Sequence, residues 1–126
     1  MPVSNSKILL VEDEVDARDI YTDILQGEDI QVDGVGDGTE ALEALEKNKY
    51  TLVLLDIIMP KMDGVETLSK IKQNPDKYGT PKVVMLSNIG GDIAIDKAME
   101  LGADGYMLKS ETEPDEFVAV VKKYLE

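Results

Sequence analysis

The sequence contains no histidine and no cysteine among its 126 residues. Without histidine there is no imidazole to act as general base, nucleophile or metal ligand, which excludes Ser-His-Asp catalysis and histidine-based metal sites. Without cysteine the chain can form neither disulfide bonds nor thiolate metal sites, and its redox compartment is left open. Any chemistry must therefore come from carboxylates, hydroxyls and lysines.

Large aromatic residues are scarce, and basic residues are half as frequent as acidic ones. With no tryptophan and one phenylalanine in a chain that is 43% hydrophobic, the core must be mainly aliphatic. The 26 acidic residues outnumber the 13 basic ones, so the formal net charge is −13. Such a surface repels phosphate backbones, and we therefore expect no direct binding of nucleic acid.

Long hydrophobic runs are also lacking. No run approaches the roughly 20 apolar residues of a membrane-spanning helix. Residues 1–6 lack the basic and apolar blocks of a signal peptide. We therefore expect no membrane insertion and a cytoplasmic location. The length is typical of one domain, and no linker or repeat divides the chain, so a single domain over residues 1–126 is expected.

Short apolar runs alternate with segments of helical periodicity along the whole chain. Strands are expected at residues 7–11, 30–35, 51–56, 82–87 and 104–108. Helices are expected at 15–26, from 37–39 past residue 45, at about 64–73, at 92–101 and at 113–125. Asn74-Pro75 should stop the third helix, and Thr112 should cap the last one, with Pro114 in its first turn.

Strict alternation of strands and helices predicts a parallel sheet with right-handed crossovers and helices on both faces. For five strands and five helices in a chain of this size, the pattern favours an α/β, flavodoxin-like (βα)5 fold. This is a doubly wound sheet with strand order 2-1-3-4-5. The first and third strands are then neighbours, and the sheet reverses direction between them.

Polar side chains follow four of the predicted strands. Glu12 and Asp13 follow the first strand, whereas Asp56, Ser87 and Lys109 end or follow the third, fourth and fifth. Ligands of open α/β sheets bind at the carboxyl ends of the strands, so these side chains should converge at one edge. Taken alone, Asp56 could equally cap its strand or begin a turn. Convergence of the whole group favours a functional site.

The residue types at this edge indicate phosphoryl chemistry. Clustered carboxylates raise each other's pKa unless a cation shares the site. Ligands that are all oxygen select Mg²⁺, or Mn²⁺, over Zn²⁺. A bound metal, a lysine ammonium and a hydroxyl would together hold a phosphoryl group in transfer. Asp56 is then placed as the nucleophile that forms an acyl phosphate.

Four segments resemble the receiver domain of two-component response regulators, over essentially the full length of the chain. They are Ile8–Glu14, Leu55–Gly64, Met85–Ser87 and Gly102–Lys109, in the order and at the spacing of that family. The resemblance implies a phosphorylation-activated signalling switch rather than an enzyme. It also implies that a histidine kinase or phosphotransfer protein donates the phosphoryl group from a phosphohistidine, in a Mg²⁺-dependent reaction.

The resemblance also assigns residue roles at the metal. It implies that Asp56 is the phosphoacceptor and that Asp13 and Asp56 are direct Mg²⁺ ligands. The backbone carbonyl of Ile58 is a further ligand, and Glu12 lies near the metal and acts through water. Glu12 stands where Asp is more frequent in the family, so its longer side chain can alter the water shell.

At the phosphoryl group, the resemblance implies that Ser87 and Lys109 contact the oxygens. Asn88 stands beside Ser87 where a small residue is usual, which can crowd the pocket. Ser110 replaces a proline that usually follows the lysine through a cis bond. Because a cis bond costs about 3–4 kcal/mol before a residue other than proline, we expect the Lys109-Ser110 bond to be trans.

Output is expected on the surface formed by residues 92–101, 104–108 and 113–125. The resemblance implies that Tyr106 is a rotamer switch coupled to Ser87, although a lone tyrosine near a strand end is often only half-buried. Ile93, Ile95 and Met99 form either a core stripe or an exposed partner surface. The partner is a downstream effector protein, and a dimer formed on phosphorylation stays an open alternative.

Two rival functions are weighed against the switch. Phosphatases and phosphotransferases of the aspartyl-phosphate type carry a second Asp two residues after the nucleophile, where this chain has Ile58. A docking module that is not phosphorylated would be favoured by loss of an acidic site residue, and none is lost. Because the last predicted helix ends with the chain, a stand-alone receiver of chemotaxis type and one cut before an effector domain both stay open.

The phosphorylated state is expected to be long-lived. Ile58 and Ile89 are the side chains expected to flank the line along which water attacks the phosphorus. Neither can hydrogen-bond a water molecule or accept its proton, and general-base help is typically worth 10²–10⁴-fold.

Overall fold

The computed structural model describes residues 7–59, 62–88 and 92–125. Its strands are β1 (Lys7–Val11), β2 (Gln31–Val35), β3 (Leu52–Asp56), β4 (Lys82–Ser87) and β5 (Gly105–Leu108). They form one sheet of order β2-β1-β3-β4-β5, and every neighbouring pair is parallel. The predicted flavodoxin-like strand order is therefore confirmed.

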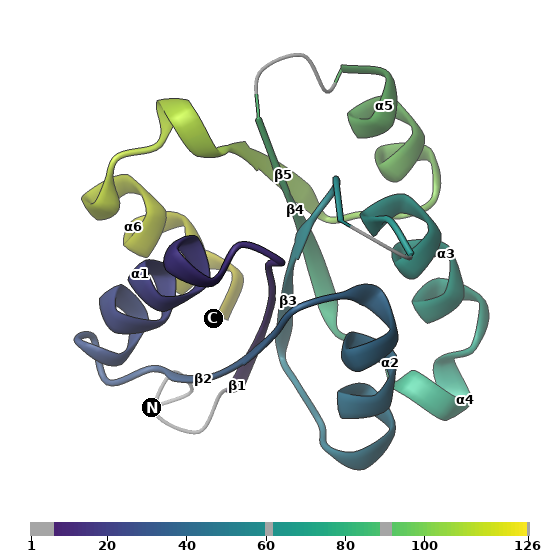
Figure 1. Ribbon diagram of the computed structural model, residues 1–126. Coiled ribbons are helices and arrows are strands. Elements are labelled where there is room, and N and C mark those ends of the chain that lie inside the picture. The colour runs from purple at the N-terminus through teal and green to yellow at the C-terminus, as the bar shows by residue number, and fades with distance from the viewer. Residues whose placement is uncertain (1–6, 60–61, 89–91, 126) are drawn as a thin grey trace.

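Helices cover both faces of this sheet. They are α1 (Val15–Gln26), α2 (Gly38–Lys47), α3 (Gly64–Gln73), α4 (Pro75–Tyr78), α5 (Asp92–Glu100) and α6 (Pro114–Leu125), with a 3₁₀ turn η2 at Lys109–Glu111. As Figure 1 shows, α1 and α6 lie on one side of the sheet, and α2, α3 and α5 lie on the other. None of the helices in the described ranges is long and apolar enough to cross a membrane.

The central strands divide their side chains between two hydrophobic cores. Alternate residues of a strand point to opposite faces, and this sheet is covered on both. Leu9 and Leu55 belong to the core under α2, α3 and α5. Leu10 and Leu54 belong to the core under α1 and α6. Both cores are largely aliphatic, as expected, and the single phenylalanine, Phe117, packs against Tyr21 with ring centroids 4.8 Å apart.

The predicted stop of α3 at Asn74-Pro75 is confirmed, since the helix ends at Gln73. The expectation of five helices needs correction, because Pro75 begins the additional short helix α4, where the fixed φ of proline suits a first helical turn. A second expectation is also wrong. Thr112 does not cap α6, which begins at Pro114 and therefore has Glu113 at the cap position. The Thr112 hydroxyl instead donates a hydrogen bond to the Leu108 carbonyl at 2.7 Å.

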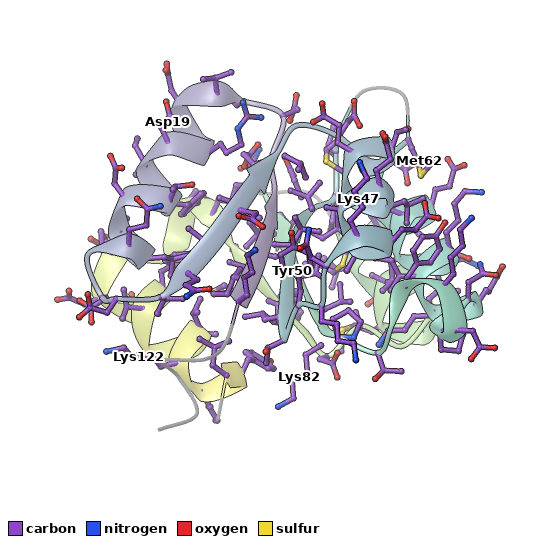
Figure 2. The ribbon with its side chains drawn as sticks, turned by 90° about the horizontal axis from the view of Figure 1, so that it is seen from below. Asp19, Lys47, Tyr50, Met62, Lys82 and Lys122 are labelled. Carbon is purple, nitrogen blue, oxygen red and sulfur yellow. The ribbon has the colours of Figure 1, made fainter. Side chains whose placement is uncertain are left out.

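Side-chain contacts also join α6 to its neighbours at the surface. Lys122 forms an ion pair with Glu28, in the turn after α1, at 2.8 Å. Lys82, at the start of β4, donates to the Tyr124 carbonyl at 3.2 Å. Figure 2 shows both lysines pointing outward from the molecule. Exposed pairs of this kind contribute little to stability, so the position of α6 depends mainly on its buried face.

Candidate functional site

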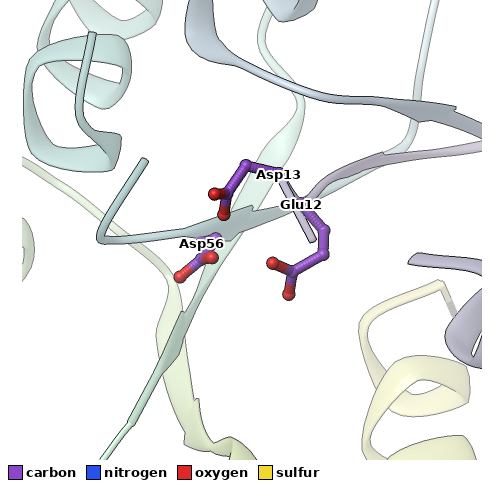
Figure 3. A group of neighbouring side chains, drawn as sticks. All are labelled: Glu12, Asp13 and Asp56. Carbon is purple, nitrogen blue, oxygen red and sulfur yellow. The ribbon is translucent and has the colours of Figure 1, made fainter. Parts of the chain in front are cut away.

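The acidic residues converge because their strands are neighbours. Val11, the last residue of β1, pairs in register with Leu55 of β3, so Glu12, Asp13 and Asp56 follow at the same edge. One carboxylate oxygen from each of these three residues lies within 4.8 Å of the others, as Figure 3 illustrates. Glu12 and Asp56 are buried, whereas Asp13 is exposed. The predicted convergence is confirmed.

Lys109 reaches the acidic cluster from the end of β5. Its ammonium lies 3.1 Å from Oδ2 of Asp56 and also pairs with Oε1 of Glu12. The peptide bond that follows it is trans, since no peptide bond within the described ranges is cis. The prediction of a trans Lys109-Ser110 bond is confirmed, and the lysine reaches the site without the family's usual proline.

Burial and charge shift the pKa values of this group. Burial raises the pKa of Asp56 to about 7, and the adjacent Glu12 carboxylate adds to that rise, whereas Lys109 opposes it. Burial by itself would lower the pKa of Lys109, but Glu12 and Asp56 overcome that effect and raise it. One lysine thus leaves the carboxylates short of positive charge, and a set of hard oxygen donors fits a further hard cation such as Mg²⁺.

Glu12 uses both oxygens of its side chain within the protein. Oε1 accepts from the Lys109 ammonium, and Oε2 accepts from the backbone N–H of Glu14 at 3.3 Å. The extra methylene of Glu relative to Asp extends its carboxylate into this lysine contact. Asp13, by contrast, presents its carboxylate to solvent.

Ser87 and Asp56 line the same cavity. Its volume is about 460 Å³, and its walls also include Ile58, Asn88 and Ile93. Ser87 is only 3% exposed, and its hydroxyl donates to the Asn88 carbonyl at 2.8 Å. The structure therefore brings the predicted hydroxyl into the cavity lined by Asp56, where it bonds the adjacent Asn88 carbonyl. Asn88 lines this cavity too, and the crowding expected from it stays a prediction.

The loop from β3 to α3 holds Asp56 through close backbone packing. The backbone N–H of Gly64 donates to the Ile57 carbonyl at 2.8 Å. A Cβ atom on Gly64 would lie 2.2 Å from the Asp56 carbonyl oxygen, so only glycine fits there. Asp63 caps α3 by accepting from the Glu66 N–H at 2.8 Å. Gly64 therefore allows close packing against the Asp56 backbone, and Asp63, directly before it, caps the start of α3.

Ile58 lies directly beside the predicted nucleophile. Its backbone N–H donates to Oδ1 of Asp56 at 3.3 Å, and its side chain is 73% exposed at the mouth of the cavity. The second isoleucine expected at this mouth, Ile89, lies outside the described residues.

The predicted output surface contains both core and exposed residues. Ile95 of α5 is buried in the core, whereas Ile93 and Met99 on the same helix are exposed, so the two alternatives each hold for part of the stripe. Tyr106 of β5 is half exposed, and its register partner is Met85 of β4.

One residue that touches the acidic edge was missed in the sequence. Arg18 of α1 donates from Nη1 to the backbone carbonyl of Glu12 at 3.0 Å. The sequence offered one signal for it, because Arg18 is the single arginine of the chain and lies in the first turn of the helix predicted at 15–26. A periodicity argument treats such a residue as part of a solvated face.

The family model described as "Response regulator receiver domain" matches residues 8–122. The chain belongs to the response regulator receiver family. This family assignment confirms the resemblance read from the four segments, and it places the protein among the regulatory domains of two-component systems.

Curated relatives include both long and short response regulators. A transcriptional regulatory protein CpxR homolog of Haemophilus influenzae is 38% identical over 120 residues, which cover 95% of this chain and 50% of the relative. The chemotaxis protein CheY of Halobacterium salinarum is 33% identical over 114 residues, covering 90% and 92%. The chain spans about half the length of the first curated relatives it matches.

Solved structures of the family have the same fold. The receiver domain of NtrX from Brucella abortus is 33% identical and superposes with a TM-score of 0.82, covering 94% of this chain and 97% of that one. A CheY-like receiver domain protein from Methanospirillum hungatei is 28% identical with a TM-score of 0.84, covering 95% and 93%.

Proposed function

We propose that this receiver domain is a phosphorylation switch, with Asp56 as the phosphoacceptor. The observation that supports it most strongly is the position of Asp56. Its buried carboxylate lies at the end of β3, in one cluster with Glu12 and Asp13, and the Lys109 ammonium contacts both Asp56 and Glu12. Nucleophile, metal ligands and counter-cation for a phosphoryl group therefore meet at one point of the sheet edge.

In the proposed reaction, a carboxylate oxygen of Asp56 attacks the phosphorus of a phosphohistidine. The new oxygen–phosphorus bond forms as the phosphorus–nitrogen bond breaks, and the departing imidazole keeps the electron pair and takes up a proton. The donor lies outside residues 1–126, on a histidine kinase or a phosphotransfer protein, because these residues contain no histidine. Lys109 and Ser87 would contact the phosphoryl oxygens, which is supported by the contact of Lys109 with the Asp56 carboxylate and by Ser87 lining the same cavity.

Mg²⁺ is the cofactor that these donors suit, with Mn²⁺ as a substitute. Asp13, Asp56 and the backbone carbonyl of Ile58 would hold it, with Glu12 acting through water. When bound, the ion neutralises charge on the phosphoryl group in transfer. Glu12 has both oxygens engaged by Lys109 and by the Glu14 N–H, which supports an indirect role for it.

The phosphoryl signal is proposed to leave through the surface of α5, β5 and α6. Ser87 and Tyr106 lie on neighbouring strands, and Ile93 and Met99 give that surface exposed apolar side chains. The partner is a downstream effector protein, with a phosphorylation-linked dimer as the alternative, and nucleic acid is not contacted directly. The whole of residues 1–126 is proposed to act as one receiver domain.

Phosphorylation with a small acyl phosphate donor tests this function. The purified chain should gain the mass of one phosphoryl group in the presence of Mg²⁺, and it should gain none in EDTA. Asp56→Asn should abolish the gain, because an amide oxygen is a far poorer nucleophile than a carboxylate. Asp19→Asn, an exposed carboxylate on α1 (Figure 2), is the matched control and should behave like wild type. Equal incorporation in Asp56→Asn and wild type would refute the assignment.

A further inference from the structure

Arg18 connects α1 to the strand end that carries the acidic pair. Its Nη1 donates to the Glu12 carbonyl at 3.0 Å. That carbonyl belongs to the peptide unit that joins Glu12 to Asp13, so the hydrogen bond orients the backbone from which both carboxylates project. The N–H of Glu12 is held as well, by the Val35 carbonyl of β2 at 3.0 Å. Arg18 therefore completes a clamp on both sides of Glu12.

Two glycines make room for the arginine. A Cβ atom on Gly34 would lie 3.1 Å from Cδ and 3.2 Å from Cγ of Arg18, and one on Gly36 would lie 3.0 Å from Nη1. The stem of Arg18 thus lies across the end of β2 in a space that larger residues would fill. Gly36 is held in turn, because its N–H donates to Oε1 of Glu40 at 2.6 Å. The side chain is partly buried and has one defined path from α1 to Glu12.

We propose that Arg18 is a positioning residue for the metal site, acting through the Glu12 carbonyl on the placement of Asp13 and Glu12. This inference rests on the Mg²⁺ binding in the proposed function. Groups that orient metal ligands typically change metal affinity 10–100-fold when they are removed. Arg18 itself touches neither the metal ligands' carboxylates nor the phosphoryl cavity through any contact found in the described residues.

The charge and the position of Arg18 should have opposite effects on Mg²⁺ affinity. A nearby positive charge repels Mg²⁺, so an arginine acting only by its charge would weaken binding, and its removal would tighten it. An arginine acting by position strengthens binding, and its removal weakens it. The two accounts predict opposite signs for one measurement. A purely structural role would lower stability and leave the affinity of the folded protein unchanged.

Mg²⁺ affinity is measured by titrating backbone amide resonances of the full chain, since there is no tryptophan to report binding by fluorescence. Arg18→Ala should weaken Mg²⁺ binding about tenfold. Arg18→Lys should recover part of that loss, because an ammonium can still donate to the Glu12 carbonyl. Lys47→Ala, which removes an exposed cation at the end of α2, should leave the affinity within about twofold.

A second variant moves the arginine without removing its charge. Gly34→Ala adds a methyl group 3.1 Å from Cδ of Arg18 and should also weaken Mg²⁺ binding severalfold. Urea unfolding in EDTA reports whether Arg18→Ala is folded. If it is not, Gly34→Ala tests the role of Arg18 in its place. Unchanged or tighter binding in Arg18→Ala, or unchanged binding in Gly34→Ala when Arg18→Ala is unfolded, would overturn the inference.

One more variant separates this inference from the proposed function. Asp13→Asn removes a proposed ligand and should abolish measurable Mg²⁺ binding at this edge. If Asp13→Asn loses binding while Arg18→Ala keeps it, only the role of Arg18 is wrong. If Asp13→Asn binds Mg²⁺ as wild type does, the metal site itself is misassigned and both proposals fall.

Discussion

Asp56 and Ile58 are separated by a single residue, yet their side chains have opposite environments. The Asp56 carboxylate is buried among Glu12 and Lys109, whereas the Ile58 side chain is 73% exposed beside the cavity. Asp56 is the proposed phosphoacceptor. Ile58 is predicted to limit how water reaches a phosphoryl group on Asp56. Each therefore gives a prediction that a single substitution can test.

The lifetime of phospho-Asp56 should depend on Ile58. We expect Ile58→Asn and Ile58→Glu to speed loss of the phosphoryl group severalfold or more, because both can hydrogen-bond an attacking water and Glu can also accept its proton. The measurement is phosphate release from the purified phosphoprotein in Mg²⁺. Ile20→Asn, an exposed isoleucine on α1, is the control and should decay at the wild-type rate. Unchanged decay in both Ile58 variants would remove residue 58 from any role in gating water.

Without a divalent cation, Asp56 should make stability depend on pH. Burial and Glu12 raise the pKa of folded Asp56 to about 7 from its ordinary 3.8, so between those values the folded state binds more protons than the unfolded state. Stability then falls as the pH rises from about 4 to about 7, and the loss stays constant above that range.

Asp56→Asn tests this pH dependence because an asparagine side chain does not bind or release a proton in this pH range. In EDTA, the free energy of unfolding of Asp56→Asn relative to wild type should increase from pH 4 to pH 7 and then level off. Urea unfolding at a series of pH values measures it, and Asp19→Asn, on the exposed face of α1, serves as control. A stability difference that is independent of pH would contradict the raised pKa.

Among the elements, β4 and β5 connect the cavity lined by Asp56 to the proposed output surface. Ser87 pairs with Leu108 and Met85 with Tyr106, so paired side chains point to the same face of the sheet. Met85 and Leu108 pack in the core under α5, which places Tyr106 on that face at the edge strand. A shift of Ser87 towards a phosphoryl group therefore occurs next to the strand that carries Tyr106.

Ser87→Ala should uncouple phosphorylation from the surface of α5, β5 and α6. The variant should still accept the phosphoryl group at Asp56, because Lys109 and the acidic residues are intact. It should lose more than half of the phosphorylation-induced amide shifts in β5 and α6. Without the Ser87 hydroxyl, nothing at this position bonds the phosphoryl group and shifts the domain from its inactive towards its active conformation. Ser69→Ala on α3, whose hydroxyl accepts a hydrogen bond from the Gln73 side chain at 3.0 Å, should keep the wild-type shifts. Wild-type shifts in Ser87→Ala would count against the coupling.

At the scale of the whole molecule, one sheet separates two cores. Leu9 and Leu10 are adjacent and fully buried, but Leu9 packs under α2, α3 and α5, and Leu10 packs under α1 and α6. Because each central strand serves both cores, neither core can lose its strands without exposing the other. The described part of the chain should therefore unfold as one unit.

Core truncations on the two faces test this cooperativity. Leu9→Ala and Leu10→Ala should each lower the free energy of unfolding by about 2–5 kcal/mol while leaving one sigmoidal transition. Far-UV circular dichroism and tyrosine fluorescence, followed against urea, should give coincident curves in both variants. Ile20→Ala, at an exposed position, should change the free energy by less than about 0.5 kcal/mol. Two separated transitions in either core variant would show that the cores fold independently.

The sequence by itself determined the fold class, the strand order and the four strand ends that form the site. Buried parallel strands are short apolar runs whose ends are marked by polar residues, as at Val11–Glu12 and Leu55–Asp56, so a local pattern carries that information. Family motifs added the roles of Asp13, Ser87 and Lys109, which remain predictions. Local signals failed at α4 and Thr112, where the competing turn and hydrogen-bond choices differ by little energy.

Only the tertiary structure decided the contacts between segments distant in the chain. It showed that Lys109 pairs with Glu12 as well as Asp56, that Arg18 reaches the Glu12 carbonyl over Gly34, and that Gly64 must lack a side chain beside the Asp56 carbonyl. It also divided the α5 stripe into buried Ile95 and exposed Ile93. These features depend on distances of a few ångströms between packed elements, and periodicity along a chain contains no such distances.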